Sequence, residues 1–156
     1  MFKEVYPHLT DNDIQIILIG LKEYFKLYVI ASRRVIIIPS RLIDRAWFEF
    51  MQEQQEYDQF CQQAFGFFLQ RSPVVEIHNS DTNNDLKILW TLACEREGID
   101  PNNPNKLPLI FSLDIQFNID DGFKFGLSDN NLFYNIKNIG SLSITAAQGG
   151  RGFPSW

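Results

Sequence analysis

The chain has 156 residues, the length of a single domain, and such a domain buries roughly two-thirds of the surface that its unfolded form exposes. Its net charge of −5 argues against non-specific binding to nucleic acid, because such binding needs a dominant basic face. Hydrophobic residues make up 45% of the chain, and its 14 Phe, 5 Tyr and 3 Trp residues predict an aromatic-rich core with some rings left at a binding surface.

Cysteine usage and the N-terminal sequence predict a cytoplasmic protein. Cys61 and Cys94 both lie in apolar helical patterns, which indicates buried free thiols in a reducing compartment. The charged residues within residues 1–13 argue against a secretory signal. The hydrophobic stretch at residues 14–30 is interrupted by Gln, Lys and Glu, and it falls short of the roughly 18 apolar residues that a membrane span needs.

The first strong helix signal begins at Thr10. The Thr10 hydroxyl can cap the first free amides of a helix, and Asp13, three positions on, favours the positive helix end. Apolar residues then recur at helical spacing, at Ile14, Ile17, Leu18, Leu21, Phe25 and Tyr28. We expect this helix to end at residues 32–34 and residues 35–38 to form an extended segment that Pro39 closes.

The next stretch predicts two helices joined by a tight bend. Ser40 is placed to cap the first of them, whose apolar face comprises Ile43, Ala46, Trp47, Phe50 and Met51. The apolar stripe stops at residues 52–56, which are polar all round, and resumes beyond them. A single continuous helix would place Gln54 on the buried line, so the pattern favours the bend. Gly66 is placed to break the second helix.

The second half of the chain predicts two further helices. Residues 78–84 are dense in Asn, Asp, Ser and Thr, which is typical of a loop that also caps the helix after it. That helix is expected to end at Gly98, with Ile99 as the hydrophobic partner of a glycine cap. Residues 107–117 read as a short helix, and residues 120–144 as irregular chain or short strands.

These elements predict a mainly α fold, a compact orthogonal helical domain of about four to five helices with an irregular or short-stranded C-terminal segment. We expect residues 1–145 to form this single globular domain. Residues 146–156 form a Gly-containing tail with too little apolar area to fold alone, and we expect this tail to be flexible.

The order of motifs in the middle of the chain resembles a known family. The motifs are Pro-Ser-x-x-Ile-Asp-x-x-Trp at residues 39–47, Tyr-x-x-Phe-Cys at residues 57–61, and Phe-Gly at residues 65–66 followed by Pro73. This order is similar to the domain of glycine-rich domain-containing proteins, most of all to the short bacterial members. Residues 90–101, from Trp90 to Pro101, also look like the C-terminal portion of those proteins.

The resemblance implies an inherited fold without the histidine chemistry of the family. Relatives typically carry a His directly after the tryptophan and others nearby, where this chain has Phe48, Phe50 and Gln70-Arg71. Phenylalanine neither binds a metal nor titrates near neutrality, as imidazole does. The two histidines, His8 and His78, stand at unrelated positions, so we expect no metal site and no cofactor.

Asp44, one helical turn before Trp47, is the main candidate among the polar residues for a site. A carboxylate next to an indole could accept a proton or hold a cationic group. A structural role is the favoured interpretation, because a buried indole donor needs a partner and a carboxylate in this place also fixes the helix. Its partner could then be the Trp47 ring nitrogen, a neighbouring amide or Arg41.

Arginines form the only basic concentration, at Arg33, Arg34, Arg41, Arg45 and Arg71. Arg41 and Arg45 are one turn apart, so both could reach a phosphate or an acidic partner. The alternative is a solvated face that Asp44 and Glu49 balance, and this is the favoured interpretation.

The leading functional hypothesis is a non-catalytic interaction domain that binds another protein through an aromatic-rich surface. Two alternatives stay open: a hydrolase-like enzyme with a site near Asp44, Tyr57 and Arg71, and an arginine-mediated nucleic-acid binder, which the acidic charge disfavours. We expect no membrane association, assign no catalytic residue, and leave a homo-oligomer open. The candidate binding residues are Arg41, Asp44, Arg45, Trp47, Phe48, Tyr57 and Arg71.

Overall fold

A computed structural model describes residues 2–32, 37–71, 80–128 and 131–134. Within these ranges the chain forms six helices and two strands: α1 (Phe2–Val5), α2 (Asp11–Ile30), α3 (Arg41–Gln52), α4 (Gln54–Ala64), α5 (Ser80–Arg96), α6 (Leu109–Gln116), β1 (Phe125–Ser128) and β2 (Asn131–Tyr134). The two strands pair antiparallel, with Phe125 opposite Tyr134. The prediction of a mainly helical domain with a short-stranded C-terminal segment is confirmed, and the short α1 is an addition to it.

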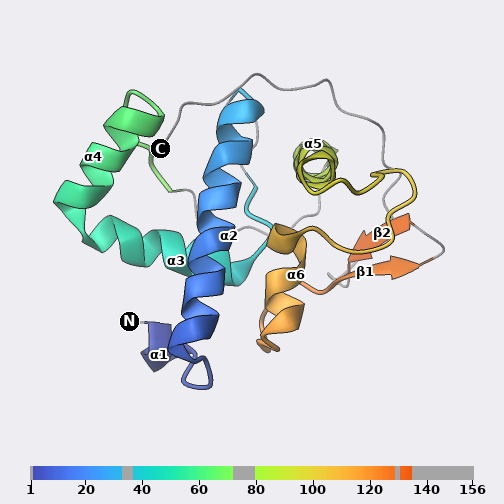
Figure 1. Ribbon diagram of the computed structural model, residues 1–156, viewed down its shortest axis with the longest axis horizontal. Coiled ribbons are helices and arrows are strands. Elements are labelled where there is room, and N and C mark those ends of the chain that lie inside the picture. The colour runs from blue at the N-terminus through green and yellow to red at the C-terminus, as the bar shows by residue number, and fades with distance from the viewer. Residues whose placement is uncertain (1, 33–36, 72–79, 129–130, 135–156) are drawn as a thin grey trace.

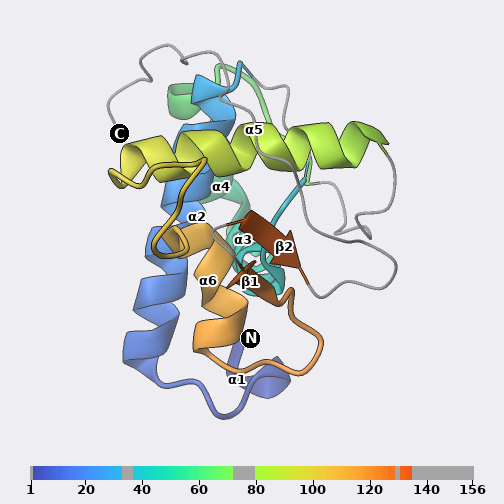
Figure 2. The ribbon, with the colours of Figure 1, turned by 90° about the vertical axis from the view of Figure 1, so that its right-hand side faces the viewer.

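The long helix α2 is the centre of the arrangement. It contacts α3, α5 and α6, and α3 in turn contacts α1, α4 and α6. Figure 1 shows α4 on one side of α2, α3 crossing behind α2, and α5, α6 and the two strands on the other side. Figure 2 shows α5 lying across α2 rather than along it, as the predicted orthogonal arrangement requires.

The ends of α2 follow from local sequence. Thr10 and Asp13 form a capping box, in which each side chain accepts a hydrogen bond from the backbone amide of the other. The helix ends at Ile30, and Ser32 beyond it has a φ of 58°. Of the predicted extended segment, residues 35 and 36 lie outside the described residues, and Ile38 is buried without belonging to a strand.

The predicted bend is confirmed, because α3 ends at Gln52 and α4 begins at Gln54. Ser40 caps α3, accepting a hydrogen bond from the Ile43 amide at 3.1 Å. The helix α4 ends at Ala64, before Gly66 with its φ of 80°. A residue with a Cβ is strained in that conformation, and glycine is therefore well suited to end the helix here.

The start of α5 differs from the prediction. The helix already begins at Ser80, so most of the polar stretch predicted as a loop belongs to its first turns; residues 72–79 lie outside the described residues. Short polar residues are well tolerated in a first turn because four amides there lack helical partners. The glycine cap is confirmed: Gly98 has a φ of 71°, and the Ile99 amide donates to Cys94 O at 2.8 Å.

The last predicted elements are confirmed where the structure describes them. The short helix is α6, and β1 and β2 are the short strands within residues 120–144. Residues 135–156, and with them the predicted boundary between the domain and the tail, lie outside the described residues.

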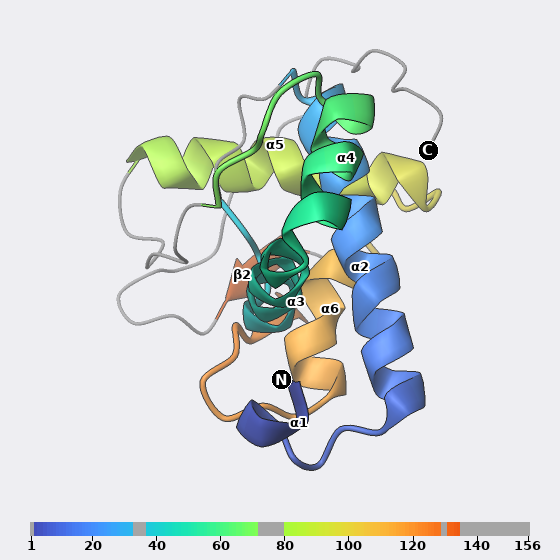
Figure 3. The same ribbon diagram turned by 90° about the vertical axis from the view of Figure 1, so that its left-hand side faces the viewer.

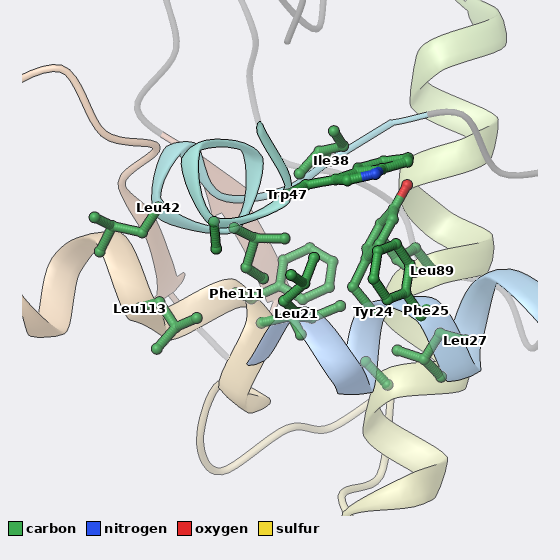
Figure 4. Packing of buried hydrophobic residues seen from close by; sticks show 14 of the residues in the cluster. Leu21, Tyr24, Phe25, Leu27, Ile38, Leu42, Trp47, Leu89, Phe111 and Leu113 are labelled. Atoms are coloured by element: carbon green, nitrogen blue, oxygen red, sulfur yellow. The ribbon is translucent and has the colours of Figure 1, made fainter. Parts of the chain in front are cut away.

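The core is a continuous aromatic cluster around α2 and α3. The Trp47 ring packs edge-on against Phe25, with centroids 5.3 Å apart, and lies 6.1 Å from the Tyr24 ring. Figure 4 shows these rings together with Phe111 and Leu113 of α6. A Cβ added at Gly20 would lie 2.6 Å from Leu113 Cδ1, so a glycine in α2 permits the close approach of α6.

Candidate functional site

Trp47 and Tyr57, two of the predicted binding residues, belong to the core. Trp47 is 3% exposed and Tyr57 is fully buried. The Trp47 indole nitrogen donates to the Tyr57 hydroxyl at 2.8 Å, and this hydroxyl donates to Leu69 O at 2.6 Å. Burial raises the pKa of Tyr57. The observed partner of the indole is thus Tyr57, not Asp44. The hydrogen-bonded pair joins α3 to α4 and to the chain that follows α4.

Asp44 instead pairs with Arg71, at the edge of α3. Arg71 Nη1 donates to Asp44 Oδ1 at 2.5 Å, and both side chains are about one-fifth exposed. This contact joins two of the predicted site residues that are 27 positions apart. The Arg71 charge is therefore already balanced by a carboxylate.

Phe48 has two guanidinium groups close to its ring. The central carbon of Arg45 lies 5.0 Å from the centroid of the Phe48 ring, and that of Arg71 lies 5.2 Å from it. Both distances suit a cation–π contact. Arg45 also pairs with Glu49 one turn on, at 3.5 Å. The structure therefore brings together Asp44, Arg45, Phe48 and Arg71 in one half-buried cluster, in which both arginines contact the Phe48 ring and Arg71 also pairs with Asp44.

Arg41 makes different contacts from Arg45, although the two are one turn apart. The Arg41 Nε donates to Asp121 O at 2.8 Å, and its guanidinium lies 5.0 Å from the centroid of the Phe123 ring. Arg41 thus ties the start of α3 to the loop before β1, and it does not join the Phe48 cluster.

Asp114 of α6 is a buried polar residue that the sequence reasoning did not single out. It is 3% exposed, and its carboxylate accepts four hydrogen bonds, from Ser40 Oγ at 2.6 Å and from the amides of Arg41, Leu42 and Phe123 at 2.8, 3.2 and 3.0 Å. Burial raises the pKa of Asp114, against the hydrogen bonds that lower it. Both oxygens are engaged, so Asp114 acts as a cap for α3 from another helix. In the sequence, Asp114 differs from its neighbours only as the one charged residue of a mostly apolar helix.

An open groove lined by α1, α2, α3 and α4 is a concave feature that sequence reasoning missed. Its volume is about 820 Å³. Its apolar lining includes Phe2 of α1, Ile14, Leu18 and Phe25 of α2, Phe50 of α3 and Phe60 of α4. Charged residues stand at its rim: Lys3, Asp11, Lys22, Glu49 and Glu53. We call this feature the apolar groove. Figure 3 shows the four helices from one side of the molecule, with α1 near the start of α2 and α4 near its end.

One side chain at the apolar groove is unusually exposed for its type. Ile19 lines the groove and is 56% exposed. Burial of an exposed isoleucine is favourable by a few kcal/mol at most, about 25 cal/mol per Å² of apolar surface. A contiguous apolar surface with a polar rim is typical of a binding site in a soluble protein.

A smaller and more polar hollow lies where residues 5–8 meet residues 118–121, with a volume of about 620 Å³. His8 lines it, and its Nε2 lies 2.8 Å from Phe117 O, which uses one ring nitrogen for a structural contact. Burial raises the pKa of Tyr6, the other titratable ring there. Within the ranges that the structure describes, no group of three or more His, Cys, Asp or Glu residues is arranged to hold a metal ion.

The fold and the groove define a small helical domain with an apolar surface groove. The chain belongs to the UCP032817-like family, whose sequence model matches residues 1–141. No curated protein and no solved structure is significantly similar to the chain. In the part of the chain that the structure describes, no helix is long and apolar enough to cross a membrane.

The family match overturns the resemblance to glycine-rich domain-containing proteins, which is wrong. That resemblance depended on short motifs, and the structure explains the motif residues by packing. Ser40 caps a helix, Trp47 and Tyr57 share a buried hydrogen bond, and Gly66 lies just beyond a helix end. Such roles recur in unrelated helical proteins, and therefore these residues do not by themselves identify a family.

Proposed function

We propose that the protein is a non-catalytic interaction domain that binds another protein through the apolar groove. The observation that carries the proposal is the groove itself, with a volume of about 820 Å³, half-buried Phe50 and Phe60 and exposed Ile19 in its lining, and charged residues beside them. Interfaces between proteins have this composition, with aromatic residues at the centre and polar residues at the rim. The predicted aromatic surface is thus assigned to Phe50, Phe60 and their neighbours rather than to Trp47.

The groove is favoured over the Phe48 cluster as the binding surface. In that cluster Asp44 balances Arg71, and Glu49 balances Arg45, so a ligand anion would have to displace a carboxylate from each arginine. The groove presents apolar surface, whose removal from water is favourable without such a displacement.

We place this activity in the cytoplasm. Cys61 and Cys94 are both free and buried, as suits a protein kept in a reducing compartment. The net charge of −5 makes a protein a more suitable partner than nucleic acid.

Affinity capture from the native host with matched variants tests the proposal. Ile19→Glu adds a charge at the groove, whereas Ile115→Glu adds the same charge to α6 at a residue that is 43% exposed and does not line the groove. A partner should be retained by the wild type and by Ile115→Glu, lost with Ile19→Glu, and then bind as a purified protein. The proposal is wrong if no captured protein distinguishes the two variants.

A further inference from the structure

The short helix α1 forms one end of the apolar groove. Phe2 and Lys3 line the groove there, and Lys3 pairs with Asp11 at the start of α2, at 2.6 Å. Figure 3 shows α1 near the start of α2, and α1 packs chiefly on α3. Phe2 is 7% exposed and belongs to the hydrophobic core. One short helix thus provides the wall at this end, whereas the longer α2, α3 and α4 form the rest of the groove.

Local sequence separates α1 from the helix that follows it. The helix α1 has four residues, and a hydrogen bond from the Tyr6 amide to Phe2 O, at 2.7 Å, closes its turn. A helix this short is not stable without tertiary packing. Pro7 cannot continue the helix, and it disfavours a helical backbone at Tyr6. The helical hydrogen bonding therefore stops between α1 and α2, so that α1 can detach without unwinding α2.

Phe2 is the main attachment of α1 to the domain, since it is the only buried residue of that helix. The Lys3 and Asp11 side chains are 52% and 90% exposed, so their ion pair contributes little. His8 Nε2 lies 2.8 Å from Phe117 O, and this contact is also exposed to water. The packing of one ring therefore decides whether α1 stays in place.

We propose that residues 2–8 form a strap, which opens as a unit while the rest of the domain stays folded and so uncovers the seat of Phe2 at the end of the apolar groove. Leu9, 3% exposed, marks where the strap ends. Opening loses the burial of one phenylalanine but restores conformational freedom to the whole strap, and these two effects oppose each other. An occupant that reaches the seat competes with Phe2, so its apparent affinity scales with the fraction of the protein in which the strap is open. The inference goes beyond the proposed function, because it concerns the groove before any partner binds.

Native-state hydrogen exchange tests the strap as a separate unit. The Tyr6 amide should exchange about a hundredfold or more faster than the Leu21 amide in the middle of α2, because opening the strap exposes only the first. Tyr57→Phe, which removes a buried hydrogen bond outside the strap, should speed exchange at Leu21 about fivefold or more and leave exchange at Tyr6 unchanged. Phe2→Ala should speed exchange at Tyr6 about tenfold or more. If Tyr6 responds to Tyr57→Phe as Leu21 does, both amides depend on global unfolding and the strap is wrong.

Thiol labelling tests whether the strap covers the groove. Ala46 lines the groove from α3, on which α1 packs, and it is 1% exposed. The thiol that Ala46→Cys introduces should be alkylated about tenfold or more faster than Cys61 in the same chain, because Cys61 is fully buried in α4 and needs a larger opening. Equal rates would overturn the strap as a cover of the groove. Neither measurement uses a partner, so the failure of either leaves the proposed function to be decided by affinity capture.

Discussion

Asp114 shows how one side chain can hold three segments together. Its carboxylate binds Ser40 and the first amides of α3, and it also accepts from the Phe123 amide before β1. Each of these donors would be costly to bury without a partner. Asp114 therefore stabilises the junction of these three segments.

Replacing Asp114 by Asn should lower the free energy of unfolding by about 1–3 kcal/mol, because the carboxamide directs an N–H₂ group toward donors that a carboxylate oxygen now satisfies. Denaturant titration measures the change. Asp120→Asn, at an exposed position in the same region, is the control and should change little. Equal stability of the Asp114 and Asp120 variants would contradict this role.

Tyr57 and Tyr24 offer a matched pair of buried hydroxyls. The Tyr57 hydroxyl both accepts from Trp47 and donates to Leu69, whereas the Tyr24 hydroxyl donates to Ile37 O at 2.9 Å. Tyr57→Phe leaves two buried groups without a partner, and we expect it to cost about 1–3 kcal/mol of stability, more than Tyr24→Phe. Thermal unfolding of both variants checks the order, and the reverse order would show that the Trp47–Tyr57 hydrogen bond matters little.

At the scale of the elements, local chemistry accounts for most of what the sequence predicted. Thr10 and Ser40 mark helix starts and Gly66 and Gly98 mark helix ends, since each acts on amides or carbonyls within a few residues. The α5 start was missed because an Asp- and Asn-rich stretch suits a loop and a first helical turn equally.

The tertiary features could not be predicted in the same way. Ser40 and Asp114 are 74 positions apart, and the Asp44–Arg71 pair depends on how the chain after α4 packs beside α3. The apolar groove combines residues from four helices, and Leu18, Phe25 and Phe50 among them have the spacing of ordinary core positions in their own helices. Sequence periodicity gives the buried face of a helix but not which part of that face its neighbours leave uncovered.

Gly98 allows a test of the glycine caps at this scale. An added Cβ there would meet no atom within 4 Å, so the positive φ of 71° is the main cost of a substitution. We expect Gly98→Ala to destabilise the protein by about 1 kcal/mol, and Gly98→Asn to cost less, because Asn tolerates the left-handed region better. Chemical denaturation of the two variants measures which substitution lowers the free energy of unfolding more. If Asn is the more damaging residue, its size rather than backbone strain sets the cost.

For the whole molecule, the two buried cysteines report on global opening. Burial raises the pKa of Cys94 to about 12, so the thiol stays protonated and unreactive well above neutral pH while the protein is folded. Because the pKa of Cys94 is higher in the folded chain than in the unfolded chain, the stability linked to its protonated thiol is fully present below the ordinary thiol pKa. That stability is lost as the pH rises toward about 12, since the unfolded chain releases the proton first.

Alkylation at about pH 8 should therefore label native Cys61 and Cys94 about a thousandfold more slowly than the chain in concentrated guanidinium chloride. Peptide mass spectrometry follows each cysteine separately. Fast labelling of either thiol in the native protein would show that its segment opens locally without global unfolding.

We propose that the apolar groove is the surface that meets a partner protein. Site-specific photo-crosslinking in the native host tests it most directly, with the residue p-benzoylphenylalanine placed at Ile19 in the groove and, in a separate variant, at Ile115 on α6. We predict a discrete crosslinked partner from position 19 that position 115 does not capture. The same products from both positions, or none from position 19, would contradict the claim.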